Sequence, residues 1–290
     1  MNSAEPNKEI PTIRNESVSS DSLNIFQEDT PIERHEVNRL PVMVKRDDLF
    51  AAPPAPALAK LRGAMMLLDK LHSRGVRLVG CWDTRISALG QGIAACCSSL
   101  PGMKVIVAFP KTKGSGIPPA IAKASELGAE ILPVIAGRIT ISFAAARQQV
   151  ERRGGVMLPF GLECPEAVSC VARAASTVPC EYTSGGTVVV STGSGATLAG
   201  LVRGLPGRPQ KFVGVSSGRS IESIWRSLRR HGVERSEAIE LVPAREAYSV
   251  RVDVGCPFPS NPYYDRKAWR FLQENAGAFA QPLFFWNVGA

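Results

Sequence analysis

Two short stretches of this chain combine residue types that can carry chemistry, and the first is a glycine-rich turn. The run Thr187–Val190 is apolar or β-branched and predicts a buried strand, after which the chain passes through Gly193, Ser194 and Gly195 into a predicted helix. A turn with so few side chains leaves backbone N–H groups free to bind a phosphate or a carboxylate. The alternative is a tight strand-to-helix turn that binds nothing.

Two familiar nucleotide-binding motifs do not match this turn. A P-loop requires lysine and then serine or threonine after its last glycine, but Gly200 is followed by Leu201. A dinucleotide fingerprint requires glycine or alanine where Leu198 stands, and an acidic residue about 20 positions later, where the chain has Val213. The turn therefore predicts an anion site of another kind.

The second stretch contains Lys60, at the start of a predicted helix. The segment 51–56 contains three prolines, which exclude helix and favour an extended path, and an amphipathic helix follows. A primary amine condenses with an aldehyde to form an imine, and cationic neighbours at a helix N-terminus should lower the pKa of Lys60. Arg62 falls on another face of the helix and stays protonated. The alternative for Lys60 is an ordinary surface lysine.

Composition limits the class of protein. The chain has 290 residues, 44% of them hydrophobic and 21% charged, and a net charge of +8. We find no apolar run long enough to cross a membrane and no signal peptide, so we expect a cytoplasmic protein without a membrane partner. The basic residues are scattered, so we expect no nucleic-acid partner. Seven cysteines without ligand spacing and three histidines predict reduced, mostly buried thiols and no metal site.

The order of predicted elements indicates an α/β fold. Residues 1–30 are polar and without apolar spacing, and we interpret them as a disordered tail. From about residue 75, short apolar runs alternate with helical patterns, which predicts right-handed βαβ units and parallel, twisted sheets flanked by helices. The predicted strands are 42–44, 76–79, 104–109, 130–134, 156–159, 187–190, 211–215 and 283–286, and the predicted helices between them include 86–100, 118–127, 141–152 and 221–231.

Several motifs in the same order resemble the pyridoxal-phosphate (PLP) enzymes of fold type II, the tryptophan synthase β-like group. The resemblance covers most of the chain from residue 40 and is nearest to D-cysteine desulfhydrase and 1-aminocyclopropane-1-carboxylate deaminase, as a divergent variant of the phage type. The motifs that carry it are Lys45-Arg46-Asp47-Asp48-Leu49, Leu58-Ala59-Lys60-Leu61-Arg62-Gly63, the Gly-Ser-Gly-x-Thr turn at 193–197, Asn261-Pro262-Tyr263-Tyr264-Asp265-Arg266-Lys267-Ala268 and Phe284-Phe285-Trp286-Asn287-Val288-Gly289.

The resemblance implies roles for particular residues. It implies PLP as the cofactor, held on Lys60, with Tyr264 and Ser87 as candidates for proton transfer or carboxylate binding. The cofactor phosphate would lie on the turn, and the pyridine nitrogen would face Asn287, a neutral amide that makes the ring a weaker electron acceptor and suits elimination or replacement. The residues of the turn are Gly193, Ser194, Gly195, Ala196 and Thr197. The chain departs from the family at Ala88, where an asparagine normally contacts the cofactor ring.

The resemblance also implies two domains with the cofactor in the cleft between them. We expect a larger domain of residues 31–81 and 166–290, a smaller domain of residues 82–165, and a homodimer. The expected function is that of a PLP-dependent lyase or deaminase that acts on a small amino acid by α,β-elimination. Two alternatives stay open, a β-replacement synthase of the cysteine or threonine synthase type, and a catalytically idle binding protein that keeps the fold.

Overall fold

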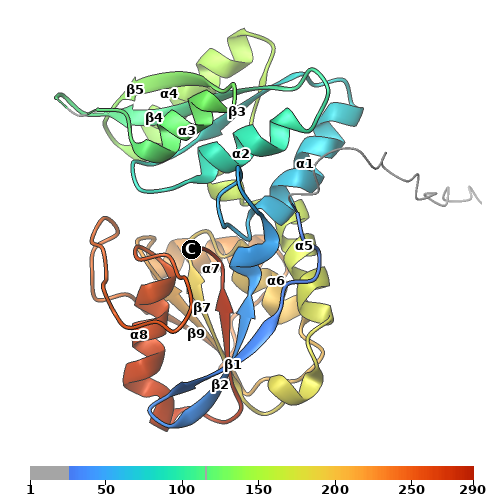
Figure 1. Cartoon of the computed structure of the whole chain (residues 1–290), viewed down its shortest axis with the longest axis vertical. Helices are drawn as coiled ribbons and strands as arrows, with labels where there is room; N and C mark the ends of the chain where they lie inside the picture. The colour runs from blue at the N-terminus through green and yellow to red at the C-terminus, as the bar shows by residue number, and fades with distance from the viewer. Residues whose placement is uncertain (1–25, 115) are drawn as a thin grey trace, which may run out of the picture.

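Two separate sheets organise the chain and lie in two lobes of the computed structural model, one above the other in Figure 1. The structure describes residues 26–114 and 116–290. Most strands pair in parallel and are joined through helices, which confirms the α/β class and the flanked parallel sheets that the sequence predicted.

The larger sheet has six strands in the order β1-β2-β10-β7-β8-β9, and only β1 and β2 pair antiparallel. Every residue of β7 and β10 at its centre is buried, which explains their nearly continuous apolar sequence. Val189 of β7 packs in one core cluster with Trp269, whereas Val188 and Val190 pack in another with Leu198, so helices cover both faces. The strands are β1 (Ile32–Val37), β2 (Leu40–Arg46), β7 (Thr187–Thr192), β8 (Lys211–Ser216), β9 (Ile239–Pro243) and β10 (Leu283–Asn287); the helices are α5 (Pro165–Ser176), α6 (Ala196–Gly204), α7 (Ile221–Arg230) and α8 (Asp265–Asn275).

The smaller sheet has four parallel strands in the order β5-β4-β3-β6. All five residues of β3 pair with β4, so the domain boundary that we predicted after residue 81 cuts through a strand and has to be moved before Leu78. The cause is that β3 enters the smaller sheet with its first residue, while the preceding helix stays with the larger lobe. The strands are β3 (Leu78–Trp82), β4 (Lys104–Lys111), β5 (Glu130–Ile135) and β6 (Val156–Met157), and the helices are α2 (Leu89–Ser98), α3 (Pro119–Glu126) and α4 (Ile139–Arg152).

Helix α1 (Leu61–Ser73) lies between the two lobes and contacts both α5 and α2. Its approach to α5 depends on Gly63, where an added Cβ would lie 2.5 Å from the Cα of Ala167. The first turn of α1 therefore packs closely on α5, and Lys60 directly precedes this turn. Four short 3₁₀ turns complete the described fold, at Asp47–Phe50, Phe160–Leu162, Cys180–Tyr182 and Ala276–Ala278.

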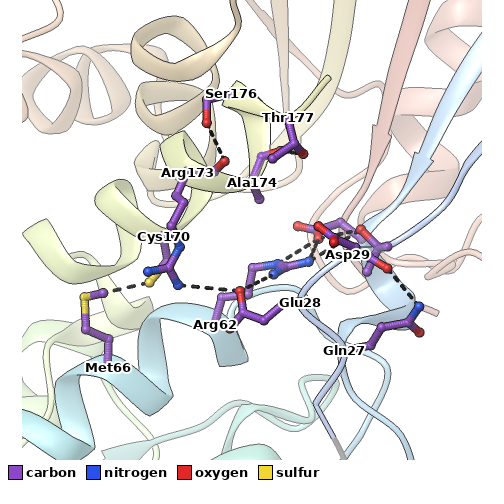
Figure 2. A network of polar contacts seen from close by, with 12 residues as sticks. Gln27, Glu28, Asp29, Arg62, Met66, Cys170, Arg173, Ala174, Ser176 and Thr177 are labelled. Atoms are coloured by element: carbon purple, nitrogen blue, oxygen red, sulfur yellow. Dashed lines mark hydrogen bonds and ion pairs between the residues drawn. The ribbon is translucent and has the colours of Figure 1, made fainter. Parts of the chain in front are cut away.

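The segment 26–30 is attached to the larger domain. Figure 2 shows Glu28 between Arg62 on α1 and Arg173 on α5, at 3.8 and 3.6 Å. Thr30 is buried and donates to Asp47 at 3.2 Å. Residues 1–25 of the predicted tail lie outside the described residues, and for 26–30 these contacts correct the prediction, because Thr30 helps to saturate a fully buried carboxylate.

That carboxylate belongs to a cluster of charged residues at the end of β2. Asp47 also accepts from Arg62 at 2.9 Å and from Trp286 at 3.0 Å, and Arg46 forms an ion pair with Asp48 at 2.8 Å. The cluster is therefore structural, and it holds α1 and β10 together behind Lys60. All seven cysteines are free and five are buried. In the described part of the chain, no helix has the length and apolar character needed to cross a bilayer.

Candidate active site

Lys60 stands directly before the first residue of α1, on a segment that is tied to the C-terminal end of the chain. The amide of Ala59 donates to the carbonyl of Val288 at 2.8 Å, and the amide of Ala290 donates to the carbonyl of Ala57 at 3.1 Å. A bridge between Leu58 and Gly289 lies between these two bonds. The backbone around Lys60 is thus fixed by the residues that follow β10, and its amine has a defined position.

Lys60 is half-buried at a cavity, and we find no hydrogen bond to its amine from any residue that the structure describes. Burial lowers the pKa of Lys60 most, Arg219 lowers it further, and Asp265 and Asp83 offset part of the change. The predicted direction is therefore confirmed, although the main cause is burial. Arg62 is turned away from the amine, since it binds Asp47 and lies 4.2 Å from the centre of the Phe50 ring. A lysine in this setting is a nucleophile more readily than one in water.

The glycine turn lies at the carboxyl end of β7, on the same cavity as Lys60. Gly195 has a φ of +94°, and it precedes the first residue of α6. An added Cβ on Gly193 would meet no atom within 4 Å, so the turn borders open space at this point. Ala196 and Thr197 line a small cavity together with Lys60. The lysine and the turn, more than 130 residues apart in sequence, are brought together as expected.

The strand next to this turn contributes a further polar group. Ser216 pairs with Thr192 in register, and the following residue, Ser217, has a buried hydroxyl without a hydrogen bond among the described residues. Arg219 donates to Glu163 at 2.7 Å and to the carbonyl of Ser194 at 3.3 Å, so it lies against the turn as a cation.

Asn287 ends β10, and both ends of its amide are bound within the protein. Its Oδ1 accepts from Ser260 at 3.0 Å and its Nδ2 donates to the carbonyl of Pro259 at 3.0 Å. The structure therefore shows Asn287 fixing the segment before α8, and its role toward a cofactor ring stays a prediction.

Asp265 is the residue that sequence reasoning missed at this end of the site. Its Oδ1 accepts from the amide of Val288 at 3.1 Å, while its buried Oδ2 has no hydrogen-bond partner among the described residues. Burial raises the pKa of the Asp265 carboxyl well above its ordinary value, and Lys60 lowers it. An acidic residue directly after Tyr264 was the available signal, but its burial could not be read from the sequence.

The smaller domain contributes a capped helix end with a buried acid. Asp83 accepts from the amides of Gly90 at 2.6 Å and Thr84 at 2.8 Å, and Ser87 also hydrogen-bonds to it. Burial raises the pKa of Asp83 to about 6, while these bonds and Lys60 lower it. Ser87 accepts from the amide of Leu89 at 3.2 Å. The predicted candidate Ser87 therefore caps α2 beside an acid that interacts with Lys60.

Tyr264, in the larger domain, interacts electrostatically with the same acid. Its hydroxyl forms a 2.7 Å hydrogen bond with that of Tyr248, and Tyr248 contacts Thr84 at 3.0 Å. Burial raises the pKa of the Tyr264 phenol, and Tyr248 and Asp83 raise it further, so the phenol stays neutral and keeps its proton at neutral pH. A neutral phenol can donate a proton, and the role of Tyr264 in proton transfer stays a prediction.

The unpaired groups of this site fit the cofactor that the motifs imply. PLP needs an amine for its aldehyde, donors for its phosphate and a polar partner for its ring nitrogen. Among residues 26–114 and 116–290, we find no hydrogen-bond partner for the Lys60 amine, for the buried hydroxyl of Ser217 beside the open glycine turn, or for one carboxyl oxygen of Asp265. We find no group of metal ligands among residues 26–114 and 116–290.

Comparison with known proteins agrees with this geometry. The family model described as "Pyridoxal-phosphate dependent enzyme" matches residues 26–264. A curated protein of Pseudomonas phage M6, named "Glycyl-dTMP PLP-dependent decarboxylase", is 29% identical in an alignment of length 277 that covers 90% of this chain and 98% of the phage protein.

Solved structures with this fold include deaminases. An ACC deaminase homologue has a TM-score of 0.73 at 21% identity, with 91% of this chain and 90% of that one covered. The processed form of threonine deaminase isoform 2 from Solanum lycopersicum has a TM-score of 0.63 at 15% identity, with 92% and 85% covered. At these identities the two structures establish the shared fold.

Proposed function

Because the chain belongs to the pyridoxal-phosphate dependent enzymes, we propose that it is a lyase that removes the carboxyl group of an amino acid carried by a nucleotide. The phage relative supports the nucleotide-borne substrate, since its name states a glycyl-dTMP decarboxylase and nearly its whole length matches this chain. In this proposal Lys60 binds the cofactor aldehyde, and the residues Gly193, Ser194, Gly195, Ala196, Thr197 and Ser217 surround its phosphate.

The observation that carries the proposal is the unpaired, buried Oδ2 of Asp265. Bound PLP withdraws electrons from the α-carbon of an amino acid, and it does so most strongly when its ring nitrogen keeps a proton. A carboxylate beside the ring nitrogen would hold that proton, and the positive charge of the ring would offset the effect of burial and favour the ionised form of Asp265. A neutral amide such as that of Asn287 cannot hold the proton. Asp265 therefore favours a reaction in which the α-carbon carries a full electron pair, as it does after loss of carbon dioxide.

The remaining steps need only proton transfer by residues of this site. When the bond between the α-carbon and the carboxylate breaks, its electron pair stays on the α-carbon and carbon dioxide leaves. One proton must then reach that carbon, and both Lys60 Nζ and Tyr264 Oη are suited to supply it. The amine of the substrate is kept, so no ammonia is formed.

A second candidate is the α,β-elimination that the motifs predict, with release of ammonia. It is favoured by Tyr264, because a neutral phenol beside the site can protonate a group that leaves the β-carbon. The two candidates share Lys60 and the cofactor and differ in the bond that breaks.

One product assay separates them. PLP-loaded protein is incubated with glycyl-dTMP, and in parallel with a panel of small D- and L-amino acids, and carbon dioxide and ammonia are measured. We expect carbon dioxide from the nucleotide and no ammonia. Ammonia with a 2-oxo acid would favour elimination, and the absence of both products would contradict the proposed function. Lys60→Ala should abolish the product, whereas Lys70→Ala, on an exposed lysine paired with Glu166, should not.

A further inference from the structure

The segment between β9 and α8 brings a second tyrosine to the candidate site. Residues 244–264 contain no helix or strand, and Figure 1 shows this part of the chain extending toward the smaller domain. Tyr248 lies in this segment. The motifs that suggested the other site residues do not include it, so no sequence pattern indicated its role.

The hydroxyl of Tyr248 joins the two domains through hydrogen bonds. It lies 3.0 Å from Thr84 Oγ1, at the end of β3 in the smaller domain, and 2.7 Å from Tyr264 Oη, before α8 in the larger domain. The two phenol rings meet edge to face, with centroids 5.7 Å apart. Tyr264 also hydrogen-bonds to Thr84, so the three hydroxyl groups form one cluster, in which Tyr248 bonds to both of the others.

The backbone and the ring of Tyr248 are held by contacts that do not involve its hydroxyl. The buried ammonium of Lys267 donates to the carbonyls of Ala247 at 2.7 Å and of Tyr248 at 3.3 Å. Its ring packs on Gly218, where an added Cβ would lie 2.8 Å from Tyr248 Cδ2. These contacts fix Tyr248 within a segment that has no secondary structure. We infer that the position of the Tyr248 hydroxyl matters.

The protonation state of the two phenols limits which hydroxyl can donate and which can accept. Burial raises the pKa of both, so each is a neutral O–H at neutral pH. In the 2.7 Å bond one hydroxyl donates and the other accepts. When Tyr248 accepts from Tyr264, the Tyr264 proton is held in this bond, and when Tyr248 donates to Tyr264, that proton is released to Thr84 or to another acceptor.

We propose that Tyr248 is a positioning residue that orients the Tyr264 hydroxyl for proton transfer and links this orientation to docking of the smaller domain through Thr84. The inference rests on the proposed function in so far as Tyr264 moves a proton there. Separation of the domains would remove Thr84 from the cluster of hydroxyl groups and release the orientation of Tyr264. Proton transfer is then confined to the closed arrangement, in which water is excluded from the site.

The test uses substitutions that remove single hydroxyl groups from the PLP-loaded, full-length protein. Tyr248→Phe keeps the ring on Gly218, and Thr84→Val removes the hydroxyl that the other domain contributes to the same cluster. Tyr263→Phe is the matched control, because we find no hydrogen bond to its hydroxyl among the described residues. kcat and KM are measured for whichever product the wild-type protein forms, together with the thermal midpoint of each variant.

We expect Tyr248→Phe and Thr84→Val each to lower kcat about 10- to 100-fold with KM changed less than about threefold, since a well-placed acid contributes about 100- to 10,000-fold. The double variant should lose hardly more than either single one, in kcat and in thermal midpoint, because both disrupt one cluster of hydrogen bonds. A kcat for Tyr248→Phe equal to that of the wild type or of Tyr263→Phe would overturn the proposal, and so would additive losses.

These outcomes are separate from failure of the proposed function. A wild-type protein that releases ammonia contradicts decarboxylation, yet the variant ratios still test Tyr248. A wild-type protein that binds PLP on Lys60 and forms no product contradicts the proposed function. In that case the non-additive change in thermal midpoint decides whether Tyr248 bridges the domains.

Discussion

Replacing Gly193 by alanine separates cofactor binding from folding more cleanly than any other change in the glycine turn. The Cβ of Gly193→Ala would meet no atom of the protein within 4 Å, and the backbone there is not left-handed. If a cofactor phosphate fills the space beside this turn, however, the new methyl group enters that space. The substitution should therefore leave the stability of the cofactor-free protein nearly unchanged and lower its affinity for PLP.

The two effects can be estimated from the structure. In the protein without cofactor, alanine at a compatible position changes stability by at most about +0.4 to +1 kcal/mol, through the unfolded chain. Loss of one hydrogen bond to a charged phosphate costs about 1.5 to 3 kcal/mol. Since about 1.4 kcal/mol is a factor of ten, PLP affinity should fall about 10- to 100-fold.

Gly195→Ala, in contrast, should destabilise the cofactor-free protein. Its Cβ would lie 3.4 Å from Ser227 Oγ, an ordinary contact, but the φ of +94° costs a residue with a Cβ about 1 to 2 kcal/mol. Titration of each variant with PLP, followed by visible absorbance, and denaturant unfolding without PLP measure the two quantities. Normal PLP affinity in Gly193→Ala would refute the placement of the phosphate on this turn.

Three further changes test the surroundings of the site. A chain that starts at Pro31 should melt roughly 2 to 8 °C below one that starts at Phe26, because it loses the bonds of Thr30 to the buried acid cluster; equal midpoints in calorimetry would contradict this. The pKa of Asp83 is raised to about 6, so its contribution to the stability of the cofactor-free protein is complete below about pH 4 and is lost as the pH rises through 6. Asp83→Asn should therefore flatten the dependence of stability on pH between these values. An unchanged dependence would show that Asp83 is ionised throughout this range. Asp265→Asn should retain PLP and change its visible spectrum while turnover falls about 100-fold, and wild-type turnover would exclude Asp265 as the partner of the ring nitrogen.

Local patterns were sufficient to predict the central strands, the glycine turn and the setting of Lys60. The apolar run of β7 and the conformation of Gly195 follow from residues next to each other in the chain. The edge strands β1 and β9 were missed, because β1 carries charged side chains and neither is fully buried. Helix α2 begins three residues later than predicted, since Asp83 and Ser87 bind its first amides.

Contacts between distant residues could not be predicted in this way. Asp265 and Tyr248 gain their significance from burial and from partners in other elements, such as Val288 and Thr84. The sequence showed an acid beside Tyr264 and a tyrosine in an irregular segment, both of which are common on surfaces. Only the packing of α8 against the end of β10, and of the smaller domain against the segment 244–264, gives them a place in the site.

The central claim is that Lys60 binds the cofactor aldehyde, and reduction followed by peptide mapping tests it most directly. PLP-loaded protein is treated with borohydride and digested, and the modified lysine is identified by mass. We predict a pyridoxyl group on Lys60 alone, because Lys45 is occupied by the carbonyl of Thr30 and Lys70 by Glu166. An adduct on another lysine, or none on protein saturated with PLP, would contradict the account.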